Sequence, residues 1–218
     1  MTLPRTYRGV VFDMDGTLVD STGSIQRSWR QWAEEFELTE GQFRGNWHGR
    51  PATDLVSHLL PPERVHEGVE RIKAIEEADA HSVVTLPGAE DALHVLRANG
   101  IPIAIATSCT RGLAEGRITG AGLFRPEVVV TADDVEHGKP SPDIFRKAAE
   151  ELGLDPTEVL VVEDAVAGVT AAHAVPTECL AVLTTTPREQ LAAELVVEDL
   201  SKVNWVITDG GVRVEANS

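Results

Sequence analysis

Two carboxylates stand two residues apart where an apolar run ends, Asp13 and Asp15 in the stretch VVFDMDGTLVDS. Strand side chains alternate, so both can point the same way, and Gly16 lets the chain turn away tightly. Like charges crowded into one small site repel and usually raise one pKa. The pair therefore predicts a metal site, a catalytic pair of carboxylates, or both. For the isolated acids, the competing interpretation is a strand followed by an acidic turn, with Asp20 as a helix N-cap.

Other polar groups follow further apolar runs. The run IPIAIATS ends at Thr107 and Ser108, whose hydroxyls can donate to a phosphate oxygen or, alternatively, cap the next helix. Lys139 is held between a glycine and a proline in HGKPSPDIF, which favours a functional cation over a solvated surface charge. The run EVLVVED ends in a second pair of acids, Glu163 and Asp164.

Taken together, these groups predict phosphoryl transfer. Carboxylate oxygens of Asp13 and Asp164, with a backbone carbonyl, suit Mg²⁺, which prefers carboxylates, waters and phosphate oxygens. The metal and Lys139 would neutralise charge on the transferring phosphoryl group. A carboxylate such as Asp13 can then attack phosphorus and give an acyl phosphate, a known form of covalent catalysis.

The pattern of apolar runs predicts how these groups are positioned. Short runs rich in β-branched residues are too short for helices and fit strands buried on both faces; they cover residues 8–14, 101–108, 127–132, 158–164 and 178–184. Helical patterns separate the last four of them. This alternation predicts an α/β protein with a Rossmann-like, doubly wound parallel sheet. The last segment, WVITDGGVRVEANS, predicts a hairpin.

One segment breaks the alternation. Residues 21–84 carry helical spacing and no convincing strand, so we expect an inserted helical cap domain there, with residues 1–20 and 85–218 forming the α/β core. The insert would lie at the carboxyl edge of the first strand, where open α/β sheets bind ligands, and is well placed to act as a lid. Its aromatic residues are expected to form a small core: Trp29, Trp32, Phe36, Phe43 and Trp47.

Composition limits the classes of partner. The 218 residues have a formal net charge of -16, which disfavours DNA and anionic membranes and requires any phosphate site to be locally positive. Cys109 and Cys179 indicate neither a disulfide framework nor a zinc site. The sequence shows no signal peptide and no apolar stretch near the roughly 18 residues of a membrane span. We expect a cytoplasmic monomer or weak homo-oligomer without nucleic-acid or membrane partners.

The stretches FDMDGTLVDS, IAIATS, GKPSPDIF and VVEDAVAGVTAA resemble the four motifs of the haloacid dehalogenase-type superfamily of phosphatases and phosphomutases. The resemblance covers nearly the whole chain, including a helical cap after the first motif. It implies that Asp13 is the nucleophile, and that Asp15 protonates the leaving group and then activates water as a base. It implies that Thr107 or Ser108 binds phosphate, with Thr107 at the key position, and that Lys139 steadies nucleophile and phosphate.

The resemblance also implies a metal site and a reaction branch. Mg²⁺ would be bound by Asp13, Asp164 and the backbone carbonyl of Asp15, with Glu163 as a ligand or water-holder. The superfamily's dehalogenases and phosphonate hydrolases lack an Asp two residues after the nucleophile, so Asp15 implies phosphate-ester chemistry. Cys109 departs from the pattern, because close relatives often have Gly or Ser there; it could line the pocket or fill a turn.

The segment HGRPATDLVSHL resembles the substrate-reading cap segment of sugar-phosphate and glycerol-phosphate phosphatases, and β-phosphoglucomutases share much of this pattern. The resemblance implies substrate contacts from His48, Gly49 and Arg50. The competing interpretations are a surface charge for Arg50 and a hydrogen-bonded packing role for His48. We expect a Mg²⁺-dependent phosphatase of a small phosphorylated sugar or polyol. The alternatives are a sugar phosphomutase and a non-catalytic binding module.

Overall fold

The structure is a computed structural model that describes residues 2–39, 42 and 52–217. Its main sheet is parallel, with strand order β5-β4-β1-β6-β7-β8. The chain adds β4 and β5 on one side of β1 and then β6 to β8 on the other. The sheet is therefore doubly wound, as predicted. The strand bounds are β1 Gly9–Phe12, β4 Ile103–Ala106, β5 Val128–Val130, β6 Val159–Glu163, β7 Glu178–Val182 and β8 Leu195–Val197.

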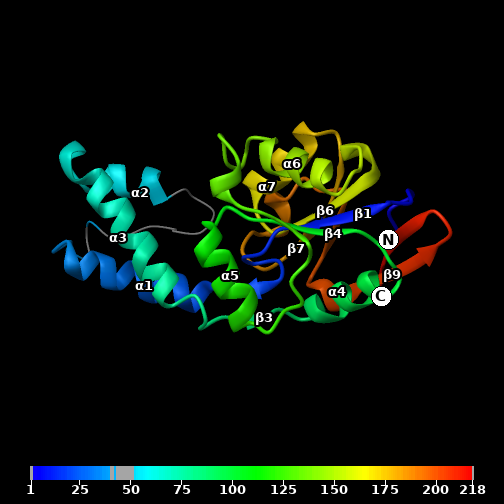
Figure 1. Cartoon of the computed structure of the whole chain (residues 1–218), viewed down its shortest axis with the longest axis horizontal. Helices are drawn as coiled ribbons and strands as arrows, with labels where there is room; N and C mark the ends of the chain where they lie inside the picture. The colour runs from blue at the N-terminus through cyan, green and yellow to red at the C-terminus, as the bar shows by residue number, and fades with distance from the viewer. Residues whose placement is uncertain (1, 40–41, 43–51, 218) are drawn as a thin grey trace.

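Helices cover both faces of this sheet (Figure 1). Helices α4 (Ala89–Ala98) and α5 (Arg111–Gly120) share one hydrophobic cluster with the strands. Helices α6 (Asp143–Glu151) and α7 (Val166–Ala174) share a second cluster with the opposite side of the strands. The sheet is thus the middle layer of three, and its carboxyl edge is left for a site.

The central strands β1 and β6 are buried along their whole length. Val11 of β1 pairs in register with Val161 of β6, and Phe12 pairs with Val162. Because consecutive strand residues point to opposite faces, a strand covered on both faces has to be apolar throughout. This accounts for the runs GVVF and VLVV, and it makes the acids at their carboxyl ends stand out.

Three helices follow β1 in the chain and have a hydrophobic cluster of their own (Figure 1). The indole of Trp32 is fully buried among them, and its Nε1 donates to the carbonyl oxygen of Gly68 at 2.8 Å. We refer to these helices as the helical block: α1 Thr22–Glu35, α2 Ala52–Leu59 and α3 Val65–Ala78.

The aromatic core predicted for the helical block is present in its described part. Trp29 and Phe36 lie in the same cluster as Trp32, and the rings of Trp32 and Phe36 stack at 4.7 Å. The predicted core residues Phe43 and Trp47 lie outside the described residues.

Two short strands lie at the connections between the helical block and the α/β part. β2 (Val19–Asp20) pairs antiparallel with β3 (Val84–Thr85). The sequence does not predict these two strands, because two residues are too few to show an alternating pattern. The N-cap residue of α1 is Ser21 and not the predicted Asp20, which stands one residue earlier; the Asp20 carboxylate still accepts a hydrogen bond from the backbone N–H of Thr22, the first residue of α1, at 3.0 Å. The exact domain boundaries at residues 21 and 84 stay a prediction.

The end of α3 and the residues after it lie against a glycine face of α5. Gly112, Gly116 and Gly120 recur every four residues and therefore share one side of that helix. A Cβ atom on Gly116 would lie 2.6 Å from Cβ of Ala80, and one on Gly120 would lie 2.5 Å from Cα of His81. The two segments approach so closely that only glycine fits at these places.

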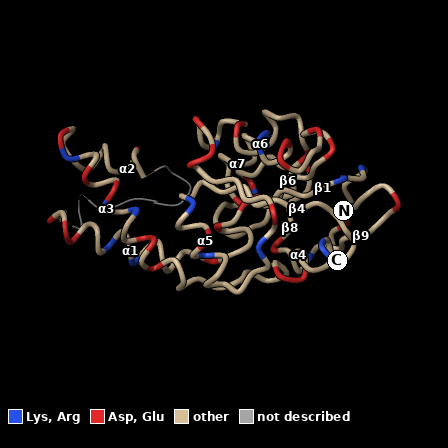
Figure 2. The backbone as a smooth tube through the Cα atoms, viewed as in Figure 1, with Lys and Arg blue, Asp and Glu red and all other residues tan. Residues whose placement is uncertain are grey.

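The chain ends in the predicted hairpin, β9 (Val203–Thr208) and β10 (Gly211–Ala216), which covers the α4 side of the sheet. Acidic positions outnumber basic ones in both the helical block and the α/β part (Figure 2). None of the described helices has the length and apolarity needed to cross a membrane. Short 3-10 helices complete the described elements: η1 Pro62–Arg64, η2 Ala132–Asp134, η3 Pro156–Glu158, η4 Arg188–Gln190 and η5 Leu200–Lys202.

Candidate active site

The carboxyl edge of the sheet gathers residues that are far apart in the sequence. Asp13 follows β1, Thr107 follows β4, and Glu163 is the last residue of β6. These three strands are neighbours in the sheet, and the backbone N–H of Asp13 donates to the carbonyl oxygen of Val162 at 2.9 Å. Parallel strands therefore bring the predicted nucleophile, hydroxyl and second acid pair to one place.

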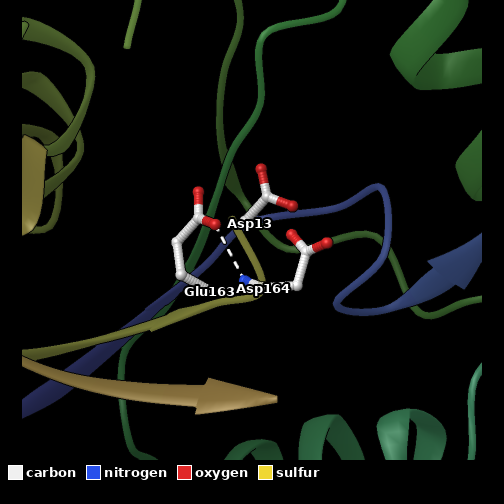
Figure 3. Close-up of side chains that lie close together, drawn as sticks. All are labelled: Asp13, Glu163 and Asp164. Carbon is white, nitrogen blue, oxygen red and sulfur yellow. Dashed lines mark hydrogen bonds between the residues drawn. The ribbon is translucent and has the colours of Figure 1, made fainter. Parts of the chain in front are cut away.

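Three carboxylates face one another at this edge (Figure 3). Asp13, Glu163 and Asp164 each offer an oxygen, and these oxygens all lie within 4.8 Å of one another. All three side chains are buried. Oε2 of Glu163 accepts hydrogen bonds from the backbone N–H groups of Asp164 at 2.8 Å and Ala165 at 2.9 Å. The start of the loop before α7 thus holds Glu163 in place.

Lys139 supplies the positive charge inside this cluster. Its Nζ lies 2.5 Å from Oδ1 of Asp13 and 2.7 Å from Oε1 of Glu163, and it donates to the carbonyl oxygen of Ala106 at 3.1 Å. Burial by itself lowers the pKa of Lys139, but the two carboxylates outweigh it and hold the pKa above its ordinary value. Lys139 is therefore a buried ammonium that ties the first acid pair to the second.

One ammonium does not balance three buried carboxylates. Burial, with repulsion from Glu163, raises the pKa of Asp13 against the opposing effect of Lys139. Burial also raises the pKa of Asp164, and Glu163 and Asp13 add to the shift. The cluster therefore favours a further positive charge, which would stabilise all three ionised carboxylates.

The residues fit a divalent cation. Carboxylate oxygens are the donors that Mg²⁺ prefers, and Asp13, Glu163 and Asp164 converge at a spacing that one ion can span. Gly16 has a φ of +88°, and a Cβ atom there would lie 2.2 Å from Oδ2 of Asp164. The turn after Asp13 thus needs glycine both for its backbone conformation and to leave room for this carboxylate.

Asp15 lies beside this cluster but has different partners. Strand β1 ends at Phe12, so Asp15 stands in the following turn and strand alternation does not orient it. Its Oδ2 lies 2.6 Å from Nη1 of Arg117 and accepts a hydrogen bond from the Cys109 thiol at 2.9 Å. Its Oδ1 is buried and has no hydrogen-bond partner in the described part of the chain. The two predicted catalytic acids are thus held by different cations.

A model of the family of haloacid dehalogenase-like hydrolases matches residues 7–175, which contain the whole acidic cluster and Lys139. The chain belongs to the haloacid dehalogenase-like hydrolase family. The resemblance carried by the four sequence motifs is thereby confirmed.

Similar proteins of this family include named phosphatases. The hydrolase is 36% identical over 200 residues to hexitol phosphatase A of Escherichia coli strain K12, covering 90% of this chain and 93% of the relative. It is 31% identical over 207 residues to validoxylamine A 7'-phosphate phosphatase of Streptomyces hygroscopicus subsp. limoneus, covering 91% and 97%. A candidate β-phosphoglucomutase from Thermotoga maritima has a similar structure, with a TM-score of 0.68, 27% identity and coverage of 89% and 95%.

The hydroxyls predicted to bind phosphate differ in their surroundings. Thr107 of the hydrolase is buried, and its Oγ1 accepts a hydrogen bond from the backbone N–H of Cys109 at 3.2 Å. Ser108 is exposed. An accepting hydroxyl still has its own proton to donate, so Thr107 can offer a hydrogen bond at the sheet edge.

The predicted substrate-binding residues of the helical block, His48, Gly49 and Arg50, lie outside the described residues. The structure therefore leaves these assignments as predictions.

Sequence reasoning missed two partners of the site in this hydrolase, Thr185 and Arg117. Thr185 donates to Oδ2 of Asp164, and no local pattern marks it. The sequence does contain an indication of Arg117. The other buried residues of α5 are Leu113, Ala114 and Ile118, so Arg117 is a charged residue on the apolar face of this helix. The Arg117 side chain is only 2% exposed. Arginines are almost never fully buried unless they are paired, and the partner of Arg117 is Asp15.

Proposed function

We propose that this hydrolase is a Mg²⁺-dependent phosphatase that hydrolyses a small phosphorylated sugar or polyol through an aspartyl phosphate on Asp13. The observation that carries the proposal is the contact of the buried Lys139 ammonium with Asp13 at 2.5 Å, within a cluster of three carboxylates. A nucleophile, a fixed cation and a set of hard oxygen ligands are the parts that phosphoryl transfer requires.

The reaction class follows from the family and its named relatives: the chain is a phosphoric monoester hydrolase. The substrate class is a finer proposal. Hexitol phosphatase A has a polyol in its name, and it aligns over 90% of this chain. Validoxylamine A 7'-phosphate phosphatase is named for a phosphorylated compound and aligns over 91% of the chain. A sugar or polyol monophosphate is the substrate that this similarity supports best.

The first chemical step uses Asp13 and Asp15. Lys139 holds Oδ1 of Asp13, which leaves Oδ2 as the oxygen that attacks phosphorus. As the new O–P bond forms, the bond from phosphorus to the sugar oxygen breaks, and Asp15 transfers a proton to that oxygen. Thr107 donates a hydrogen bond to a phosphoryl oxygen.

The second step returns the enzyme to its starting state. Asp15, now a carboxylate, takes a proton from water as the water oxygen attacks the phosphorus of the aspartyl phosphate. The Asp13–phosphorus bond breaks, and inorganic phosphate leaves. When bound by Asp13, Asp164 and the Asp15 carbonyl, with Glu163 as a ligand or water-holder, Mg²⁺ supplies positive charge for the phosphoryl oxygens and relieves the repulsion among the carboxylates.

We propose that the chain is divided into a cap and a core. Residues 21–84 would form a cap over a core made of residues 1–20 and 85–218, and would close on the substrate to exclude water. The separate hydrophobic cluster of the helical block supports this division. His48, Gly49 and Arg50 stay proposed substrate contacts of that cap. A cytoplasmic monomer or weak homo-oligomer without nucleic-acid or membrane partners stays the prediction from composition.

A screen for phosphate release tests the function. Purified protein with Mg²⁺ is given sugar, polyol and nucleotide monophosphates, each with and without EDTA. We expect turnover of a sugar or polyol monophosphate that EDTA abolishes and excess Mg²⁺ restores. Full activity in EDTA would contradict the metal requirement. If no phosphate ester is hydrolysed, the non-catalytic binding module becomes the better interpretation.

The phosphomutase alternative has one observation in its favour, the structural similarity to the candidate β-phosphoglucomutase. A mutase would return the phosphoryl group from Asp13 to bound sugar instead of to water. With a hexose 1-phosphate as substrate, a phosphatase releases inorganic phosphate, whereas a mutase produces the isomeric sugar phosphate. Product analysis by ³¹P NMR separates the two.

A further inference from the structure

Among the described residues, the Asp15 carboxylate has hydrogen-bond and ion-pair partners on one oxygen only. Nη1 of Arg117, the Cys109 sulfur and Oδ2 of Asp15 form a triangle whose sides are 2.6, 2.9 and 3.0 Å. Arg117 and Cys109 are both buried. Oδ1 of Asp15 is buried too, yet it has no hydrogen-bond partner among the described residues. Thus Oδ2 has two partners, whereas Oδ1 has none among the described residues.

We infer that Arg117 is a positioning residue for proton transfer: it holds Oδ2 of Asp15, so that Oδ1 is the oxygen that gives and takes the proton. The inference rests on the proposed acid–base role of Asp15. When Oδ1 carries the proton, Oδ2 is the carbonyl oxygen of the acid and still accepts hydrogen bonds from Arg117 and Cys109. The carboxyl group can therefore change its protonation state without turning.

The Cys109 thiol works in the same direction. The thiol donates to the same Oδ2 at 2.9 Å, and its sulfur accepts from Nη1 of Arg117 at 3.0 Å. Cys109 follows the phosphate-side hydroxyls of the β4 loop, so this loop and α5 both hold the same Asp15 oxygen.

Arg117 is pre-organised for this role by its burial. The guanidinium is planar and permanently charged, and its 2% exposure leaves it no room to move into solvent. Two further atoms of the group, Nε and Nη2, are buried without a hydrogen-bond partner among the described residues. An arginine buried at this cost is best explained by the acid that it serves, because stability alone would favour an apolar residue in the stripe of α5.

The test compares leaving groups. A sugar or polyol oxygen needs protonation to leave, whereas a nitrophenoxide leaves with little help. The phosphorylation step is followed as kcat/KM for a polyol phosphate and for p-nitrophenyl phosphate, in the wild type, Arg117→Met, Arg117→Lys and Asp15→Asn, with Mg²⁺ present. Arg125→Met, which removes an exposed ion pair with Glu115, serves as the control variant.

Arg117→Met should lower kcat/KM for the polyol phosphate about 10²-fold, the lower range of what a general acid contributes, and affect the nitrophenyl ester much less. It should thereby show the same leaving-group dependence as Asp15→Asn. Arg117→Lys, which retains a cation, should recover part of the polyol activity. If Arg117→Met does not fold, the same comparison between the two esters is made on Arg117→Lys, and a selective loss for the polyol ester is expected.

Two kinds of failure are distinguishable. Equal losses for both esters would show that Arg117 has a structural role, and no loss for either would show that it does not position Asp15. Both results would overturn this inference and leave the proposed phosphatase function in place. A wild type that hydrolyses neither ester nor any other phosphate ester would overturn the proposed function, and this inference with it.

Discussion

Gly168 and Glu163 are packed so tightly that a Cβ atom on residue 168 would lie 1.7 Å from Oε1 of Glu163. That oxygen is also the one that contacts Nζ of Lys139 at 2.7 Å. The first turn of α7 is thus a wall that sets where this carboxylate can stand. A methyl group in that wall would have to displace the carboxylate from Lys139.

Gly168→Ala should therefore lower phosphate release roughly 10–100-fold, the usual effect of disturbing the partners of a metal or active-site group. It should also raise the Mg²⁺ concentration that is needed for half-maximal activity. The control is Gly23→Ala in α1, where a Cβ atom would meet only the flexible end of Arg27. Unchanged activity in Gly168→Ala would show that activity does not depend on the position of the Glu163 carboxylate.

Replacing Lys139 tests the cation at the centre of the cluster. Lys139→Met leaves Asp13 and Glu163 buried without their shared partner, which should cost about 3–5 kcal/mol of unfolding free energy. We expect kcat to fall about 10²–10³-fold, because a fixed charge near the transferring group is lost. Lys147→Met, which breaks an exposed pair with Glu151, should change neither quantity. Denaturant unfolding and phosphate release measure both, and a silent Lys139→Met would exclude this role.

The nucleophile is tested by a change of one atom. Asp13→Asn retains an oxygen that can accept from Lys139, so the fold should remain intact, as circular dichroism would show. An amide cannot form the acyl phosphate, so turnover should fall more than about 10³-fold. Asp91→Asn on the exposed start of α4 is the matched control. Near-wild-type hydrolysis by Asp13→Asn would contradict the covalent mechanism.

Glu76 of α3 gives a prediction about stability and pH. Burial raises its pKa from 4.5 to about 7; Arg117 opposes this shift and Asp15 adds to it. A carboxyl group whose folded pKa is raised stabilises the fold fully below its unfolded pKa and loses that contribution as pH rises through the folded pKa. The contribution should therefore be complete below pH 4.5 and lost between pH 4.5 and about 7.

Glu76→Gln removes this ionisation. At pH 8 the variant should be more stable than the wild type by up to about 3 kcal/mol, and the difference should shrink as pH falls toward 4.5. Urea unfolding at several pH values measures it, with the exposed Glu63→Gln as control. A stability difference that does not vary with pH would rule out the burial of an ionised Glu76 as its cause.

The parts predicted from the sequence are those that local pattern encodes. The apolar runs that precede Asp13, Thr107 and Glu163 form neighbouring strands, as predicted. They are recognisable because a strand buried on both faces has to be apolar, and polar side chains follow where the strand ends. Strand β8 was missed, since its three residues, LVV, are too few to show a pattern. The contact of Asp15 with Arg117 was missed for another reason: it pairs two segments about a hundred positions apart, and no periodicity reports such a pair.

The glycine face of α5 also connects the helical block to the acid–base side of the site. A side chain on Gly116 or Gly120 would meet the segment after α3, so it would have to push α5 and that segment apart. Arg117 directly follows Gly116 in α5, and it is the residue that contacts Asp15. A shift of α5 at this face would therefore move the partner of Asp15 together with the contact of the helical block.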